Sequence, residues 1–249
     1  MIFILQVMFF FWGLYFIKNK IDKALFKKSS LTHTISPQTT IIAFDIHGVL
    51  FAPDKKKIKK VIKSHPSVFN VLVYAFWPPF LLNVYKLVRK KAVPEEIINH
   101  LSSRYKLIAK HKQFAIQLAN AQKHIPYMEN LVTKLKDLGY ELHIFSNIGS
   151  EIFKELSDQH YTLFKLFDKI YIPHRENNFI GKPHHQAFRD YLKRCNNSKQ
   201  QVIFIDNRWR NIKSAHQSNI FGIHFKSAQQ LTKELQQLAV IKEIIANPT

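Results

Sequence analysis

The sequence predicts an α/β fold in which a core with a parallel sheet follows an N-terminal membrane-anchor helix and carries an inserted all-helical cap. Three observations support this prediction. The chain starts with an uncharged apolar run, short β-branched runs later alternate with helical patterns, and one long stretch between the first two strands shows helical patterns only. With 249 residues, 46% of them hydrophobic, the chain can bury a sizeable core and is not of the disordered class.

Residues 1–28 are predicted to form a membrane anchor with a basic flank, and residues 29–39 a polar linker. Met1–Ile17 carries no charge, and as a helix it is slightly shorter than the hydrocarbon core of a bilayer. The lysines that follow it place the globular domain in the cytoplasm and would contact an anionic lipid surface. A cleaved signal peptide is disfavoured because no basic residues precede the run. The alternative is a buried N-terminal helix of a soluble protein.

The core, residues 40–52 and 126–249, is predicted to be a Rossmann-like parallel sheet with helices between its strands. Ligands bind at the carboxyl ends of the strands in such sheets. The expected strands are Thr40–Phe44, Glu141–Phe145, Ile170–Ile172, Gln201–Ile205 and Gly222–Phe225. The expected helices are Tyr127–Leu138, Ser150–Gln159, Pro183–Arg194, Trp209–Gln217 and Ala228–Ala246.

Residues 53–125 are predicted to be a helical cap inserted after the first strand. The spacing in "PEEIINHLSSRYKLIAKH" is amphipathic, and we expect helices only from Pro53 to Ile125. Ser67–Val88 is apolar nearly all round but is interrupted by Pro78 and Pro79. It fits either two cap helices that bury their apolar faces or a surface that enters the membrane beside the anchor.

Charge and cysteine content limit the possible partners. The formal net charge is +20, and the lysines are spread along the chain without an RNA-binding signature or a zinc-finger pattern. We therefore expect a solvated basic surface or attraction to acidic lipid or substrate, no nucleic acid and no specific protein partner. The single cysteine, Cys195, cannot form a disulfide within the chain, which fits a reducing compartment.

Polar side chains follow the predicted strands where each strand ends. The first strand is followed by Asp45, and the second by Ser146 and Asn147. "IGKPHHQAF" places Lys182 at the start of a helix, and the strand "VIFID" ends on Asp206. Because these ends meet at one edge of a parallel sheet, the side chains are candidates for a single site.

The order and spacing of these residues resemble those of the haloacid dehalogenase superfamily. "FDIHGVLF" resembles its first motif, Ser146 the second, Lys182 the third and "FIDNRWRNIKSA" the fourth. The resemblance covers residues 40 to 226, cap included. It implies a magnesium-dependent hydrolase, of the phosphatase type, that acts on a phosphorylated small molecule.

The resemblance also implies roles for individual residues. Asp45 would attack phosphorus and form an aspartyl-phosphate. Ser146, Asn147 and Lys182 would bind the phosphoryl group, with Ser146 and Lys182 also serving catalysis. Mg²⁺ would be held by Asp45, the backbone carbonyl of His47 and Asp206.

His47 departs from the pattern, because phosphatases of this family carry an aspartate there that protonates the leaving group and then activates water. Three interpretations stay open. His47 is a substitute general acid and base, since imidazole titrates near neutral pH. Alternatively, the site performs other chemistry, as family dehalogenases and phosphonate hydrolases do without this aspartate. In the third interpretation the site is degenerate, and the protein binds a phosphorylated or membrane-associated partner without turnover.

Overall fold

The computed structural model describes residues 31, 34–65, 78–89, 94–106, 109, 111–174, 180–195 and 201–240. The chain divides into two units, Met1–Ser30 and Leu31–Thr249, and every described residue belongs to the second. The predicted membrane anchor therefore lies outside the described residues. Within the described ranges, no helix has both the length and the apolar character needed to cross a membrane.

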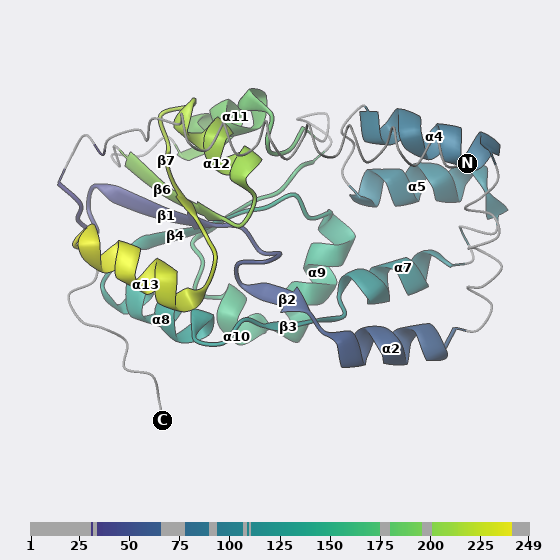
Figure 1. The fold of residues 1–249 in the computed structure, drawn as a ribbon, viewed down its shortest axis with the longest axis horizontal. Helices are drawn as coiled ribbons and strands as arrows, with labels where there is room; N and C mark the ends of the chain where they lie inside the picture. Colours follow the sequence, from purple (N-terminus) through teal and green to yellow (C-terminus); the bar gives the residue numbers. More distant parts are fainter. Residues whose placement is uncertain are drawn as a thin grey trace, which may run out of the picture. The chain divides into compact units, whose positions relative to one another are not determined.

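Five parallel strands form the central sheet in the order β5-β4-β1-β6-β7 (Figure 1). Their bounds are β1 Thr40–Phe44, β4 Glu141–Phe145, β5 Lys169–Tyr171, β6 Gln201–Asp206 and β7 Phe221–His224. The predicted parallel sheet is thus confirmed, with β5 and β7 shifted by one residue from their expected positions. The chain adds strands on one side of β1 and then on the other, so the order reverses at β1.

Helices cover both faces of this sheet (Figure 1). Alternate residues of β1 point to opposite layers: Ile42 and Phe44 pack in one hydrophobic cluster, and Ile41 and Ala43 in another. The first cluster includes residues of α8 (Met128–Asp137), α9 (Ser150–Gln159), α10 (Tyr161–Phe164) and α13 (Ala228–Gln237), and the second those of α11 (His185–Cys195) and α12 (Trp209–His216). Burial on both faces explains why β1 has no polar alternation.

The last helix is shorter than the sequence predicts. Helix α13 ends at Gln237, whereas the expected helix runs to Ala246. Ala239 adopts a left-handed conformation with φ of 57°, and the Val240 N–H donates to the Leu235 carbonyl. This turn ends the helix. Residues 241–246 lie outside the described residues.

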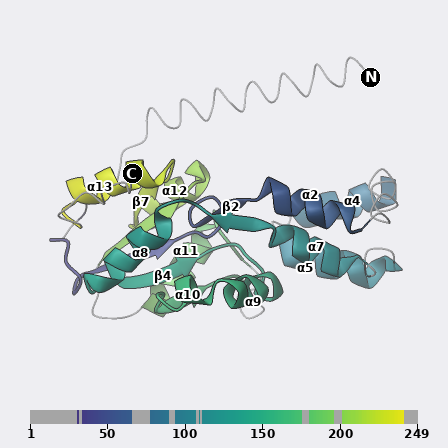
Figure 2. The ribbon, with the colours of Figure 1, turned by 90° about the horizontal axis from the view of Figure 1, so that it is seen from below.

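A two-stranded antiparallel ribbon corrects the prediction of helices only from Pro53 to Ile125. Strand β2 (Phe51–Pro53) pairs with β3 (Gln122–His124), with Phe51 opposite His124 and Pro53 opposite Gln122. Both figures show this ribbon between the main sheet and helices α2 (Lys55–Lys63) and α7 (Lys112–Ala119) (Figures 1 and 2). The two ends of the insertion are therefore joined by backbone hydrogen bonds.

The described parts of the insertion otherwise form helices, as predicted. Besides α2 and α7 they are α4 (Pro78–Arg89) and α5 (Pro94–Arg104). Helix α4 begins at Pro78, so both prolines that interrupt the apolar run occupy its first turn, where a missing N–H breaks no helical hydrogen bond. Lys112 of α7 forms an ion pair of 2.8 Å with Glu151 of the core helix α9.

Candidate active site

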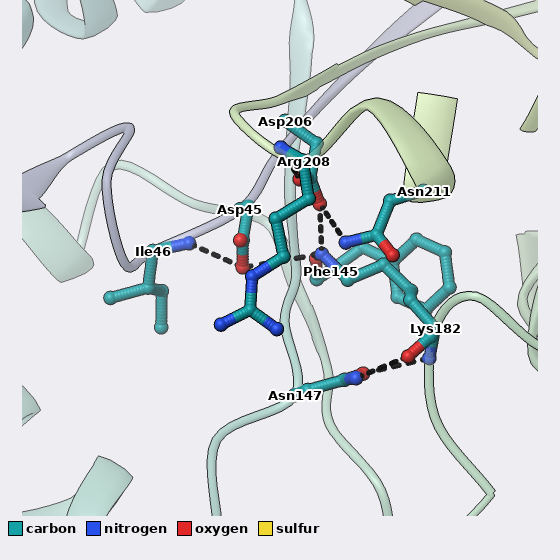
Figure 3. Close-up of polar contacts among 8 residues, drawn as sticks. All are labelled: Asp45, Ile46, Phe145, Asn147, Lys182, Asp206, Arg208 and Asn211. Atoms are coloured by element: carbon teal, nitrogen blue, oxygen red, sulfur yellow. Dashed lines mark hydrogen bonds and ion pairs between the residues drawn. The ribbon is translucent and has the colours of Figure 1, made fainter. Parts of the chain in front are cut away.

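The candidate site lies at the carboxyl ends of β1, β4 and β6, where the strand order reverses (Figure 3). Asp45 follows β1, Ser146 follows β4, and Asp206 is the last residue of β6. Ligands of parallel sheets bind at this position, because the loops on either side of the reversal point diverge and leave a crevice. The residues that the sequence places at separate strand ends are thus brought to one edge of the sheet.

The chain turns sharply directly after Asp45. The N–H groups of Val49, Leu50 and Phe51 all donate to the Ile46 carbonyl, at 2.9–3.3 Å. Gly48 has a φ of +82°, and a Cβ atom on it would lie 2.0 Å from the Asn207 amide nitrogen. Any other residue at position 48 would therefore strain the backbone and displace the Asn207 side chain.

Through its ammonium, Lys182 contacts both carboxylates of the site, those of Asp45 and Asp206. Its buried ammonium donates to the Phe145 carbonyl at 2.6 Å and to Asp206 Oδ2 at 2.7 Å, and it lies 3.2 Å from Asp45 Oδ1. These three acceptors match the three hydrogens of an ammonium group. Asp45 also accepts from the Ile46 N–H at 2.8 Å. The lysine thus holds both carboxylates close to one positive charge.

Asp206 is fully buried and accepts hydrogen bonds on both oxygens. Besides Lys182, the Arg208 N–H donates to Oδ1 at 2.7 Å and the Asn211 amide donates to Oδ2 at 2.8 Å. Burial raises the pKa of the Asp206 carboxyl, the Lys182 ammonium opposes this rise, and the neighbouring Asp45 carboxylate adds to it.

Asn147 holds the backbone of Lys182. Its Oδ1 accepts from the Lys182 N–H at 2.8 Å, and its amide nitrogen donates to the Lys182 carbonyl at 2.6 Å (Figure 3). The amide therefore orients the segment that carries the ammonium. Binding of substrate by Asn147, which the sequence predicts, stays a prediction.

Two buried oxygen atoms at this edge of the sheet lack a hydrogen-bond partner among the described residues. They are the Ser146 hydroxyl and Asn207 Oδ1. A buried polar atom without a partner loses its hydrogen bonds to water and gains none within the protein, so such atoms are uncommon in folded proteins. Ser146 directly follows β4 and Asn207 directly follows β6, so a ligand bound at the site would supply the missing hydrogen-bond partner.

His47 lies in the turn after Asp45, and its side chain contacts the ribbon. Nδ1 is 2.9 Å from Oε1 of Gln122 on β3, and the ring is half-buried. Its other nitrogen, Nε2, has no partner within the described part of the chain. The site therefore includes an imidazole with one nitrogen engaged and one available.

The donor atoms present fit a magnesium ion. Asp45 and Asp206 supply two buried carboxylates, which the single ammonium of Lys182 compensates only in part, and the Asn207 amide oxygen has no partner in the described chain. Magnesium prefers such oxygen ligands and is commonly held by one or two carboxylates with several waters. No cluster of three or more His, Cys, Asp or Glu ligands occurs within the described ranges. We therefore expect modest affinity.

Sequence reasoning missed three supporting residues. Asn211 and Arg208 hold Asp206, and Gln122 holds His47. Asn211 and Arg208 lie within the fourth motif, so their place in the sequence could have suggested a role. Gln122 is 75 positions from His47 in a segment expected to be helical, and no sequence pattern connects the two residues.

The fold and the site together define the chain as an α/β protein with a doubly wound parallel sheet and a candidate site where the strand order reverses. A family model described as haloacid dehalogenase-like hydrolase matches residues 39–219, more than half of the chain. The chain belongs to this family.

Individual relatives agree with this assignment. The chain is 29% identical over 196 residues to sesquiterpene phosphatase astK from Aspergillus oryzae (strain ATCC 42149 / RIB 40), covering 78% of this chain and 94% of that protein. The fold of this chain is similar to that of a magnesium complex of a HAD family enzyme from Bacteroides thetaiotaomicron. The TM-score is 0.56 at 18% identity, with coverage of 80% of this chain and 99% of that chain. Magnesium-bound YfnB from Bacillus subtilis gives a TM-score of 0.57 at 15% identity, with coverage of 80% and 98%.

Proposed function

We propose that this protein is a magnesium-dependent phosphomonoester phosphatase that acts through an aspartyl-phosphate on Asp45. The observation that supports this most directly is the position of the Lys182 ammonium, 2.7 Å from Asp206 and 3.2 Å from Asp45, at the strand end that also carries the unpartnered Ser146 hydroxyl. A carboxylate, an ammonium and a free hydroxyl at one point are what an incoming phosphoryl group requires.

In the first step the Asp45 carboxylate attacks phosphorus, and the bond from phosphorus to the leaving oxygen breaks. Lys182 and Ser146 stabilise the negative charge on the phosphoryl oxygens. Bound magnesium, held by Asp45, Asp206 and the His47 carbonyl, would add positive charge at the same oxygens. The leaving oxygen takes its proton from Nε2 of protonated His47, so the alcohol departs neutral.

In the second step a water molecule attacks the aspartyl-phosphate. Neutral His47 takes a proton from this water through Nε2, inorganic phosphate leaves, and the Asp45 carboxylate is restored. His47 then carries the proton needed for the next cycle. Imidazole suits this exchange because it gains and loses a proton near neutral pH.

We further propose that the substrate is a phosphomonoester with an apolar group, with a C15 isoprenoid phosphate as the first compound to test. This proposal is supported by the similarity to a protein named as a sesquiterpene phosphatase. The predicted anchor at residues 1–28 would hold the globular domain on the cytoplasmic side of a membrane, where amphiphilic phosphates collect.

The test is phosphate release by the full chain from a panel of phosphomonoesters, with magnesium and with a chelator. We expect release that requires magnesium and that is abolished by Asp45→Asn, which keeps the shape of the side chain and removes the nucleophile. Asp158→Asn is the matched control, because Asp158 is an exposed aspartate on α9 that pairs with Lys154 one helical turn away. Asp206→Asn should weaken magnesium binding in calorimetry.

A second function is favoured by the presence of His47 in place of the family's aspartate: binding of a phosphorylated ligand without turnover. The two functions give opposite results in the same panel. Wild-type protein that is inert toward every compound, together with a His47→Asp variant that releases phosphate, would contradict the phosphatase proposal and favour the binding function.

A further inference from the structure

We propose that Gln122 is a positioning residue for His47, which fixes the imidazole as its Nδ1–H tautomer and leaves Nε2 as the proton-transferring atom. The catalytic part of this inference rests on the proposed phosphatase function. The tautomer itself does not, because it follows from hydrogen bonds within the chain.

The orientation of the Gln122 amide determines which tautomer is present. Its nitrogen donates to the Ala119 carbonyl at 2.6 Å. A carbonyl oxygen can only accept, so the amide nitrogen must face Ala119 and the amide oxygen must face His47. That oxygen lies 2.9 Å from Nδ1 and also can only accept. Nδ1 of His47 therefore carries a hydrogen.

Gln122 is itself held in place from several sides. Its side chain is buried, its strand β3 pairs with β2, and its carbonyl accepts from the Lys57 ammonium of α2 at 3.0 Å. The Asp54 N–H donates to the carbonyl of the preceding residue, Ala121, at 2.9 Å. An acceptor fixed in this way restricts the rotation of the ring that it binds, as supporting residues do in other catalytic sites.

This arrangement suits a residue that must act first as an acid and then as a base. Nδ1 keeps its hydrogen in neutral imidazole of this tautomer and in the imidazolium ion, so the bond to Gln122 survives both states. The proton that moves is then on Nε2, which has no partner within the described residues. A neutral amide serves both states without adding a charge to the site.

The test combines a spectroscopic measurement with kinetics on the full chain in detergent. Two-bond ¹H–¹⁵N correlation spectra of ¹⁵N-histidine-labelled protein, assigned with His47→Gln, identify the nitrogen that carries hydrogen. The variants are Gln122→Met, which keeps the volume and removes the acceptor, and Gln122→Glu, which keeps an acceptor. Lys123→Met is the matched control, because Lys123 is the exposed residue next to Gln122 on β3.

We expect wild-type His47 to show the Nδ1–H tautomer, and Gln122→Met to lose it. Gln122→Met should also lower kcat by about 10- to 100-fold with little change in KM, the usual effect of removing the hydrogen bond that orients a functional imidazole. Gln122→Glu should retain the tautomer and much of the rate, and Lys123→Met should resemble wild type.

Two results would overturn the inference. One is a wild-type His47 with hydrogen on Nε2 and none on Nδ1. The other is a Gln122→Met variant that matches Lys123→Met in both tautomer and kcat. A wild type that is inert but shows the Nδ1–H tautomer, lost in Gln122→Met, would instead contradict the phosphatase proposal and uphold the positioning role.

Discussion

His47 stands two residues after the proposed nucleophile, where phosphatases of this family carry a second aspartate. The sequence identified the position and the chemistry that imidazole allows, but it left three interpretations open. The structure adds the hydrogen bond between Nδ1 of His47 and Gln122, a residue that the sequence did not point to. The acid–base role of His47 stays a prediction, and the turnover of His47 variants tests it.

A different histidine, His143 on β4, should make stability depend on pH. It is fully buried, with Nε2 2.8 Å from Glu141 and Nδ1 2.9 Å from the Tyr191 hydroxyl of α11. Burial lowers the pKa of His143, although the Glu141 carboxylate opposes this effect. As the pH falls, His143 of the unfolded protein therefore binds a proton at about pH 6.5, whereas His143 of the folded protein binds it only at lower pH. Stability is therefore complete above that pH and falls as the pH is lowered through it.

Urea unfolding between about pH 8 and pH 5 tests this expectation. The free energy of unfolding should decrease toward the acid end, and His143→Gln should reduce that decrease. His100→Gln is the control, since His100 is an exposed histidine of α5. A His143→Gln variant with the same pH slope as His100→Gln would show that His143 does not titrate differently in the two states.

At the scale of elements, the sequence predicted neither the short helix α10 nor the β2–β3 ribbon. Strand β3 reads Gln-Lys-His and contains no β-branched residue, so local propensity does not favour a strand there. It becomes extended because it pairs with β2, whose own register is fixed by the turn after Asp45. Such pairing between distant segments leaves no periodic signal in the sequence.

The N-terminal element carries a prediction of its own. Met1–Ile17 is uncharged and is followed by five lysines up to position 28, so we expect it to hold the full chain on membranes. After cell fractionation, full-length protein should stay with membranes through washes with high salt and with carbonate. A truncated chain that starts at Ser30 should be largely released.

Two outcomes of the fractionation would contradict the assignment of the membrane contact to Met1–Ile17. Full-length protein that is soluble throughout would exclude the anchor. A truncated chain that still pellets would assign the membrane contact to another segment, and the apolar run Ser67–Val88 would then be the first to examine.

At the scale of the whole molecule, the parts that sequence reasoning predicted correctly are those set by burial. All five residues of β1 are buried because helices cover both faces of the sheet, and this produces the uninterrupted apolar run that marks the strand. Asp45, Ser146 and Asp206 stood out because each one breaks such a run at its end. The contacts of Gln122 and Asn147 could not be predicted, because they depend on how separate segments meet.

The central claim is that Asp45 is phosphorylated during turnover and that His47 then activates the water that removes the phosphoryl group. Mass spectrometry of acid-quenched full-length protein, mixed with magnesium and p-nitrophenyl phosphate, tests it most directly. The p-nitrophenolate leaving group needs no proton, so His47→Ala should allow the first step and slow the second. We predict a phosphoryl adduct on the Asp45 peptide that accumulates in His47→Ala and is absent in Asp45→Asn. An adduct that persists in Asp45→Asn, or an active wild type whose His47→Ala variant shows no adduct, would contradict the account.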